Sequence, residues 1–232
     1  MPKNESPFTA SDAPRKKGRA DKEPPDKRER ILRAAIKVFA RKGFYATRVS
    51  EIAKAAGVAD GTIYLYFKNK DDVLVSIFSD RLTRLLTVLR REIDAAPDFD
   101  AKLRRAIELQ LGLLEGQRDL AEVVTVNLRQ SSLLLKQYAA PLFTEYLDVL
   151  ASVIAMGQRE GIVAPELAPR VVATALWGAL DGVALTWAIG SQMKDDKARE
   201  DGRSKVSSDE RLRRAATQIA RIFLHGVRAE RA

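Results

Sequence analysis

The stretch that decides the fold is Val49–Lys68, which reads VSEIAKAAGVADGTIYLYFK. Two short helical segments meet here at a sharp turn, where Gly57 can supply the positive φ that the turn requires. Ala53 is small at the point where two helix backbones must approach closely. The apolar side chains expected to form the shared core are Ile52, Val58 and Ile63. This pattern is typical of a helix-turn-helix, which places a short helix in the major groove of DNA.

The second helix of this pair carries the residues that we expect to contact DNA. Asp60 can cap the helix, and Gly61 lets its N-terminus approach another surface, where unpaired N–H groups favour phosphate. Basic and aromatic side chains then follow one another on one short helix, which suits a major groove and its flanking phosphates. We expect Thr62 and Leu65 at base edges, Tyr64, Tyr66, Lys68 and Lys70 at phosphates, and Phe67 in the core.

The charge of the chain is concentrated at the same end. The 232 residues carry a formal charge of +9. Residues 1–70 hold 17 Lys and Arg against 8 Asp and Glu, whereas residues 71–232 hold 23 of each. A basic end joined to a neutral body indicates a partner that is a polyanion, with double-stranded DNA as the first candidate and an anionic membrane surface as the second.

Residue usage also excludes several kinds of chemistry. The chain has no cysteine and one histidine, so it lacks thiolate zinc sites, multi-histidine metal sites and cysteine nucleophiles. We therefore expect no metal and no cofactor. The absence of cysteine fits a reducing compartment, and no apolar run precedes Ile31, so we expect a cytoplasmic protein.

The rest of the chain has the periodicity of helices, and no segment alternates apolar and polar residues, so we expect an all-α protein. Start signals for helices are Asp26 with Glu29, Asn69 with Asp72, Asp119 with Glu122, Ser207 with Glu210, Pro97-Asp98 and Pro165 to Pro169. The expected helices are 26–43, 49–56, 61–67, 70–95, 99–116, 119–127, 130–160, 167–190 and 208–228. The charged segment 193–208 is expected to be a loop.

Three parts of the chain are expected. Residues 1–25 hold five of the nine prolines and are interpreted as a disordered basic arm, either a solubilising tail or an arm that follows phosphates. Residues 26–70 form the helix-turn-helix DNA-binding domain, and residues 71–232 form a ligand-binding and dimerisation domain. The run 171–190 is apolar enough to suggest a membrane span, but Asp181 and three glycines favour a buried interface helix.

The last two helices are expected to form the interface of a homodimer. Apolar side chains recur at helical spacing on both, and Gly178 and Gly182 allow close backbone approach. The expected interface residues are Trp177, Leu180, Ala184, Ile219, Ile222 and Phe223.

Two charged residues, Arg129 and Asp181, stand among apolar neighbours. Each is either exposed or held by a structural partner, which could be the other. Alternatively, Arg129 with Asn127 and Gln130, and Asp181 nearby, meet a polar or anionic group of a ligand held between the helices.

The segment 26–74 resembles the DNA-binding domain of the tetracycline-repressor (TetR) family, and GVADGTIYLYFKNK (57–70) is similar to its signature. The resemblance implies two-domain, all-helical subunits that bind a palindromic operator as a homodimer, usually as a repressor. It also implies DNA contacts at Arg48, Ser50, Thr62, Tyr64, Tyr66 and Lys70, with Asp60 and Leu65 at places that vary with the operator.

A narrower resemblance joins VADGTIYLYFKNKDD with NLRQSSLLLKQ (127–137), which together are similar to the FadR-type fatty-acid-degradation repressors of that family. It implies a small-molecule effector, long-chain acyl-CoA, held by an apolar tunnel and by cationic groups for the CoA part. Candidates for those cations are Arg90, Arg91, Arg104, Arg105 and Arg118.

Three other classes of protein compete with this interpretation. A multidrug-sensing TetR-family regulator of an efflux gene shares every feature except the second motif. A sequence-independent architectural DNA-binding protein would also be basic at one end but would need no neutral body. An acyl-CoA enzyme would need a nucleophile or base for which no motif is found, so we expect no enzymatic activity.

Overall fold

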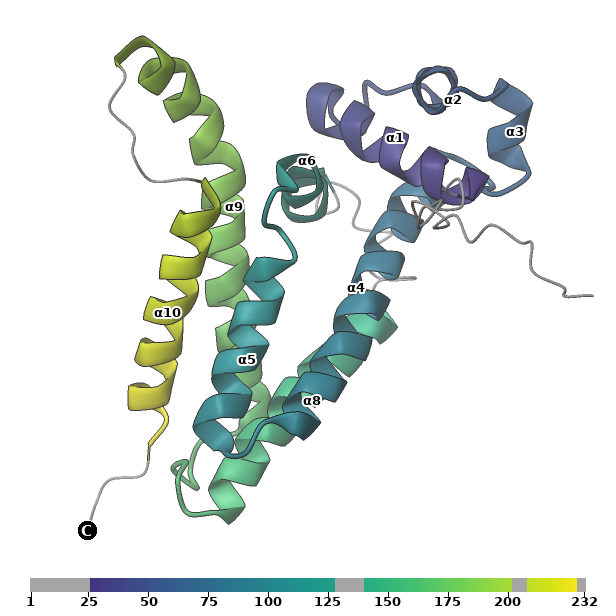
Figure 1. Cartoon of the computed structure of the whole chain (residues 1–232). Helices are drawn as coiled ribbons and strands as arrows, with labels where there is room; N and C mark the ends of the chain where they lie inside the picture. Colours follow the sequence, from purple (N-terminus) through teal and green to yellow (C-terminus); the bar gives the residue numbers. More distant parts are fainter. Residues whose placement is uncertain (1–25, 128–139, 202–207, 229–232) are drawn as a thin grey trace, which may run out of the picture.

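The computed structural model describes residues 26–127, 140–201 and 208–228, with backbone alone at 127, 191–201, 208 and 209. The described part is α-helical, with one π-helical turn and an isolated β-bridge between Val163 and Arg228, which confirms the all-α expectation (Figure 1). The elements are α1 (Lys27–Lys42), α2 (Val49–Ala56), α3 (Asp60–Tyr64), α4 (Lys70–Ala95), α5 (Phe99–Gly112), α6 (Arg118–Glu122), the π-helix η1 (Val123–Asn127), α8 (Ala140–Arg159), α9 (Pro169–Asp201) and α10 (Ser208–Gly226).

Local signals located some helix starts correctly. The Asn69 side chain accepts the Asp72 N–H at 2.8 Å at the start of α4, and Asp98 accepts the Ala101 N–H at 2.8 Å at the start of α5. Pro169 is the first residue of α9, as its fixed φ favours.

At two other starts the helix begins within one residue of the signal, but the expected cap is not formed. Helix α1 begins directly after Asp26, whose side chain makes no cap, and Glu29 pairs with Arg33 at 2.6 Å. Helix α6 begins at Arg118, so Asp119 lies inside it and cannot cap it. The fourth signal begins at Ser207, which lies outside the described residues.

The expected loop 193–208 was wrong over its first nine residues, because α9 continues to Asp201. This part has no glycine or proline before Gly202, and its Lys, Arg, Glu and Ala residues are good helix formers. A lack of apolar side chains therefore did not end the helix. Residues 128–139, which include the start of the expected helix 130–160, lie outside the described residues.

The molecule has two hydrophobic cores. The first joins α1–α3 to the start of α4 up to Ile77, and it also includes Leu120 and Val123 from the α6–η1 corner. The second lies among α4, α5, α8, α9 and α10. Phe78 packs against both cores. In Figure 1, α1–α3 gather at one end of α4, while α9 and α10 lie on the far side of α5.

Two helices are long and apolar enough to cross a membrane, namely α8 and the part of α9 from Pro169 to Gly190. In this fold they pack against each other. Leu147 and Leu150 of α8 and Leu176 and Leu180 of α9 are buried in the second core. Burial of apolar side chains in the core thus accounts for part of the apolar composition of both helices.

Candidate nucleic-acid interface and effector cavity

The turn between α2 and α3 is stabilised by a side chain of α1. Gly57 has a φ of 65°, as expected, and its N–H bonds back to α2. Arg30 of α1 donates from Nη2 to the Ala56 carbonyl at 2.8 Å, so it satisfies an acceptor that the end of α2 leaves open. A Cβ at Gly57 would lie 3.3 Å from this Nη2. No sequence signal pointed to this role of Arg30, since it depends on how α1 crosses α2.

The face of α3 that points away from the core is exposed. Tyr64 is 58% exposed and Leu65 81%, whereas Ile63 and Phe67 are buried, which confirms the expectation for Phe67. Two large side chains without core contacts on so short a helix indicate a contact surface. Of the other predicted DNA contacts, Arg48, Ser50, Asp60, Gly61, Tyr66 and Lys68 are exposed and Thr62 is half-buried.

The cap expected at α3 is absent, whereas a cap that was not predicted forms at α2. Asp60 is the first residue of α3 and makes no cap, because the helix starts after Ala59. At α2, Glu51 accepts the backbone N–H of Arg48 at 3.0 Å and pairs with Lys42. The Arg48 N–H and then Lys42 hold the pKa of Glu51 below its ordinary value. Glu51 therefore fixes the start of α2 beside Arg48.

Lys70 is half-buried, and its ammonium group is bound to backbone carbonyls of the same unit. Its Nζ donates to the carbonyls of Phe44 at 2.7 Å, Thr47 at 2.9 Å and Tyr45 at 3.2 Å, and it sits 4.5 Å from the centre of the Phe44 ring. An ammonium group has three N–H donors, and these carbonyls use all of them. The geometry thus does not support the expected phosphate contact of Lys70. It makes Lys70 the residue that holds the connection from α1 to α2.

A cavity of about 440 Å³ lies in the body. Its walls come from α4, α5, α8 and α9, with residues of the α6–η1 corner, and are mainly apolar. The volume falls in the range of sites that hold a small molecule. The apolar lining residues include Phe78, Leu82, Leu85, Leu111, Leu114, Leu120, Val124, Phe143, Trp177, Leu180 and Ala184.

Five polar residues also line this cavity: Arg81, Gln110, Thr125, Tyr146 and Asp181. The Tyr146 hydroxyl donates to Gln110 Oε1, and burial raises the pKa of Tyr146. The hydroxyl thus stays protonated, and the Gln110 amide is held in one orientation. The Thr125 hydroxyl donates to the Ala121 carbonyl at 2.7 Å within the π-helical corner, a local geometry that is frequent at functional sites.

The DNA-binding unit and the cavity are connected in two places. Arg28 of α1 and Asp80 of α4 form a two-bond ion pair at 2.7 and 3.2 Å, and Arg28 also lies over the Phe67 ring at 5.6 Å. In addition, Phe78 and Leu120 line the cavity and pack in the core of the DNA-binding unit. A molecule in the cavity would therefore touch side chains on which α1–α3 rest.

The structure places the predicted ligand contacts unevenly. Asp181 lines the cavity, as the prediction requires. The side chain of Asn127, and all of Arg129 and Gln130, lie outside what the structure describes. Arg81 was missed, although a charged residue on the apolar face of α4, between Phe78 and Leu85, was the signal that could have found it.

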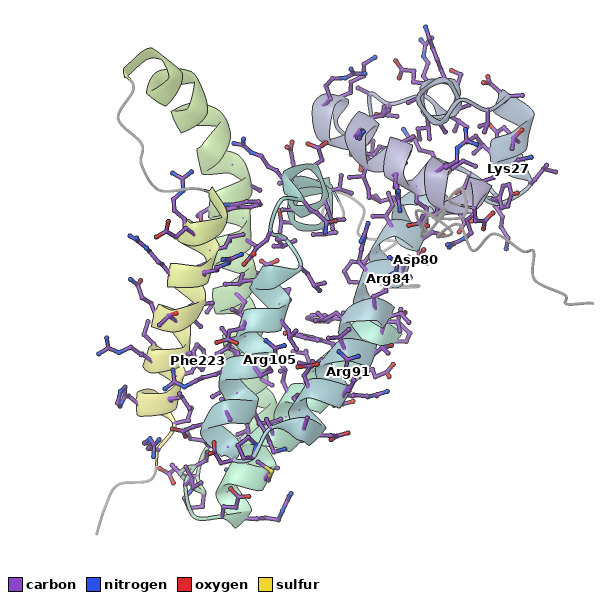
Figure 2. All side chains as sticks on the ribbon, viewed as in Figure 1. Lys27, Asp80, Arg84, Arg91, Arg105 and Phe223 are labelled. Carbon is purple, nitrogen blue, oxygen red and sulfur yellow. The ribbon has the colours of Figure 1, made fainter. Side chains whose placement is uncertain are left out.

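Most candidate cations for a CoA group are already paired. Arg90 pairs with Glu145 at 2.7 Å, and both Arg91 and Arg105 pair with Glu92 at 2.8 Å. Figure 2 shows that Arg91 and Arg105 come from neighbouring helices, α4 and α5. Arg90 and Arg105 thus join helices of the body to one another, whereas Arg91 pairs with its own neighbour on α4.

Half of the predicted dimer contacts are buried inside the subunit. Leu180 and Ala184 line the cavity, and Ile219 is buried in the second core, so their side chains are not available to a partner. Trp177 also lines the cavity and packs edge-on against Phe143, with ring centres 4.8 Å apart. Phe223 is half-buried on the side of α10 that faces α5 (Figure 2).

Only Ile222 of the predicted dimer contacts is a large apolar residue on the surface, at 68% exposure. Val171 and Ile189 on α9 are the other large apolar residues exposed in this part of the described chain. These three exposed positions are the large apolar side chains of α9 and α10 that are accessible to a partner subunit among the described residues.

The described residues contain no group of three His, Asp or Glu side chains that could hold a metal ion.

Comparison with known proteins identifies both parts of the chain. A family described as bacterial regulatory proteins, tetR family, matches residues 31–77, and one described as YsiA-like protein, C-terminal region, matches residues 78–201. The fatty acid metabolism regulator protein of Bacillus subtilis is 36% identical over 165 residues, which are 71% of this chain and 85% of that protein.

Solved structures agree with the sequence relatives. The fatty acid degradation regulator FadR from Bacillus halodurans superposes with a TM-score of 0.73 at 32% identity, covering 90% of this chain and all of the other. FadR from Bacillus subtilis in complex with stearoyl-CoA superposes with a TM-score of 0.72 at 31% identity, covering 86% and 98%. These relatives are named as regulators, not as enzymes.

Proposed function

Since the chain belongs to the TetR family of bacterial regulatory proteins, we propose that it is a transcriptional repressor that binds a palindromic operator as a dimer and is released by long-chain acyl-CoA. The observation that carries this proposal is that one helix, α4, serves both the DNA-binding core and the wall of the apolar cavity. The relative that was solved with stearoyl-CoA supports the choice of ligand. Both DNA and acyl-CoA are found in the cytoplasm, where we place the protein.

The exposed face of α3 supplies the contacts with DNA. Leu65 and Thr62 lie where a helix in the major groove meets base edges, and Tyr64, Tyr66 and Lys68 lie beside them for the flanking phosphates. Arg48 and Ser50 at the start of α2 add contacts to the backbone of the duplex. Lys70 and Arg30 contribute indirectly, because they hold the connections on which α2 and α3 depend.

The cavity supplies the response to the effector. Burying an acyl chain contributes about 0.8 kcal/mol per CH₂, so a long chain binds tightly among these leucine and aromatic side chains. A ligand lowers operator affinity only by the ratio of its affinities for the two conformers of the protein. Contact of the acyl chain with Phe78 and Leu120 would make the two conformers differ in ligand affinity, because both side chains also pack in the core of α1–α3.

The test is a titration of operator-bound protein with stearoyl-CoA, followed by fluorescence anisotropy of labelled operator DNA. We expect release by stearoyl-CoA and no release by CoA alone, since CoA has no chain to fill the cavity. Binding to random DNA as tight as to any inverted repeat would contradict the repressor function and favour an architectural protein. Release by uncharged drugs but not by acyl-CoA would favour a multidrug sensor.

A further inference from the structure

Among the described residues, Arg81 is the one cationic side chain in the wall of the cavity. It lies on α4 between Phe78 and Leu85, so it shares the face that these apolar residues turn toward the cavity. It is half-buried, and no described residue forms a hydrogen bond or ion pair with its guanidinium group. Five N–H donors thus border an otherwise mainly apolar space.

The charges around Arg81 do not balance. Arg33, Arg81 and Arg84 lie close together here, and the carboxylates that act most on Arg81 in the described part of the chain are those of Glu29 and Asp80. Asp80 is used by Arg28 and Glu29 by Arg33. Burial, and then the charge of Arg84, lower the pKa of Arg81. An added anion would relieve this repulsion.

We propose that Arg81 binds an anionic oxygen, of a phosphate or a carboxylate, in the head group of the molecule whose chain fills the cavity. The ligand class is therefore an amphiphile with a long apolar chain and an anionic head. The inference rests on the proposed function, because it names the residue that anchors the effector. Arg84 lies on α4 close to Asp80 (Figure 2), does not line the cavity and stays outside the contact.

The position of Arg81 also joins the anchor to the DNA-binding unit. Arg81 directly follows Asp80, whose carboxylate holds α1 through Arg28. An anion bound at Arg81 places new negative charge next to this ion pair. The head group and the chain would thus act on the same turn of α4.

The test compares three ligands that share one chain: oleoyl-CoA, oleate and the uncharged oleyl alcohol. Binding to the full-length protein is followed by the fluorescence of Trp177, which lines the cavity. We expect Arg81→Gln to weaken binding of the anionic ligand by about 10- to 100-fold, the usual effect of removing a charge-assisted hydrogen bond, and to leave oleyl alcohol unchanged. If Arg81→Gln weakens binding of oleoyl-CoA alone, Arg81 binds a phosphate of the head group. If it weakens binding of oleate alone, Arg81 binds the carboxylate.

Two variants keep the result interpretable. Arg84→Gln removes an equal charge that does not line the cavity, so it should weaken binding of the anionic ligands far less than Arg81→Gln does and leave oleyl alcohol unchanged. Arg81→Lys keeps the charge and should recover part of the affinity, which a merely unfolded variant would not do. If Arg81→Gln binds the three ligands normally, Arg81 does not bind the head group, while the proposed response to acyl-CoA is unaffected. If the unaltered protein binds none of them, the proposed function itself fails.

Discussion

Two cations stabilise the DNA-binding unit from beneath its surface. Lys70 gathers three backbone carbonyls between α1 and α2, and Arg30 meets the carbonyl at the end of α2. Carbonyls at helix ends have no partner within their own helix, so a cation that reaches them fixes the chain in one path. The charged residues of this unit thus have two roles. Lys70 and Arg30 bond backbone carbonyls and stabilise the fold, whereas residues such as Lys68 are exposed to solvent.

Replacing Lys70 by Met should lower the free energy of unfolding by about 1.5–3 kcal/mol, because half-buried carbonyls would be left without a charged donor. Urea unfolding followed by circular dichroism measures this change. Lys68→Met is the matched control, since it should change the stability by less than about 0.5 kcal/mol. Its effect should instead be on DNA binding, where removing one phosphate partner reduces the slope of log affinity against log salt by about 0.9. Equal stability of the two variants would contradict the role given to Lys70.

Leu65 is the side chain that we expect to read the operator most directly. It is the most exposed large apolar residue of the described chain. Leu65→Ala should leave the stability within about 0.5 kcal/mol, yet lower the discrimination between operator and altered operator by about 1–3 kcal/mol. Competition binding with single-base changes measures this. Phe67→Ala is the contrast, because it should cost about 3–5 kcal/mol of stability. A variant of Leu65 that reads every operator normally would place base recognition elsewhere on α3.

Helix α4 connects the cavity to the DNA-binding unit. Its first turns complete the core of α1–α3, and its middle lines the cavity with Phe78, Arg81, Leu82 and Leu85. The ion pair from Asp80 to Arg28 ties this middle part to α1. A small rotation or shift of α4 on ligand binding would therefore move α1, and α1 holds the α2–α3 turn through Arg30.

Asp80→Asn should weaken this coupling. The variant removes the charge that holds Arg28 but leaves the cavity wall intact, so acyl-CoA should bind with nearly unchanged affinity. The change in operator affinity caused by saturating stearoyl-CoA should fall by about 1 kcal/mol, the upper range for a partly exposed ion pair. Anisotropy titrations with and without ligand measure both quantities. Glu92→Gln breaks ion pairs of the body instead, and should leave the coupling unchanged.

Signals contained within one turn of sequence were the ones that predicted structure well. Asn69, Asp98 and Gly57 act on residues within a few positions, so their patterns predicted two helix starts and one turn. Asp26 also marked the start of α1 correctly, but its capping box does not form, and Glu29 pairs with Arg33 instead. Competition between neighbours is not visible in a capping pattern.

The cavity could not be predicted in the same way, because it depends on how helices pack. Helix α9 has apolar residues on two faces, and the face with Trp177, Leu180 and Ala184 was assigned to the dimer, whereas it lines the cavity. Periodicity shows that a face is apolar but does not say what covers it. Likewise Lys70 was expected at a phosphate, since its carbonyl partners lie more than 20 residues away in sequence.

The second apolar face of α9 remains on the surface of the subunit. Val171 and Ile189 lie on it, with Gly178 between them at helical spacing, and Ile222 is exposed on the adjacent helix α10. The cavity-lining face and this outer face are neighbouring faces of one helix, since Trp177 of the cavity wall directly precedes Gly178. A partner subunit on the outer face would thus rest on the same helix that contacts the effector.

Gly178→Leu tests this arrangement sharply. A Cβ at Gly178 meets nothing within 4 Å in the subunit, so the subunit itself should fold normally and its helix should gain up to about 1 kcal/mol from replacement of a glycine. If two copies approach closely here, the added side chain should separate them and lower operator affinity, since each half-site would be bound alone. Sedimentation velocity and operator titration measure the two effects. Gly112→Leu on α5, an exposed helical glycine with the same open space, should remain dimeric. If the Gly178→Leu protein is still dimeric at nanomolar concentration, the dimer interface does not lie on the outer face of α9.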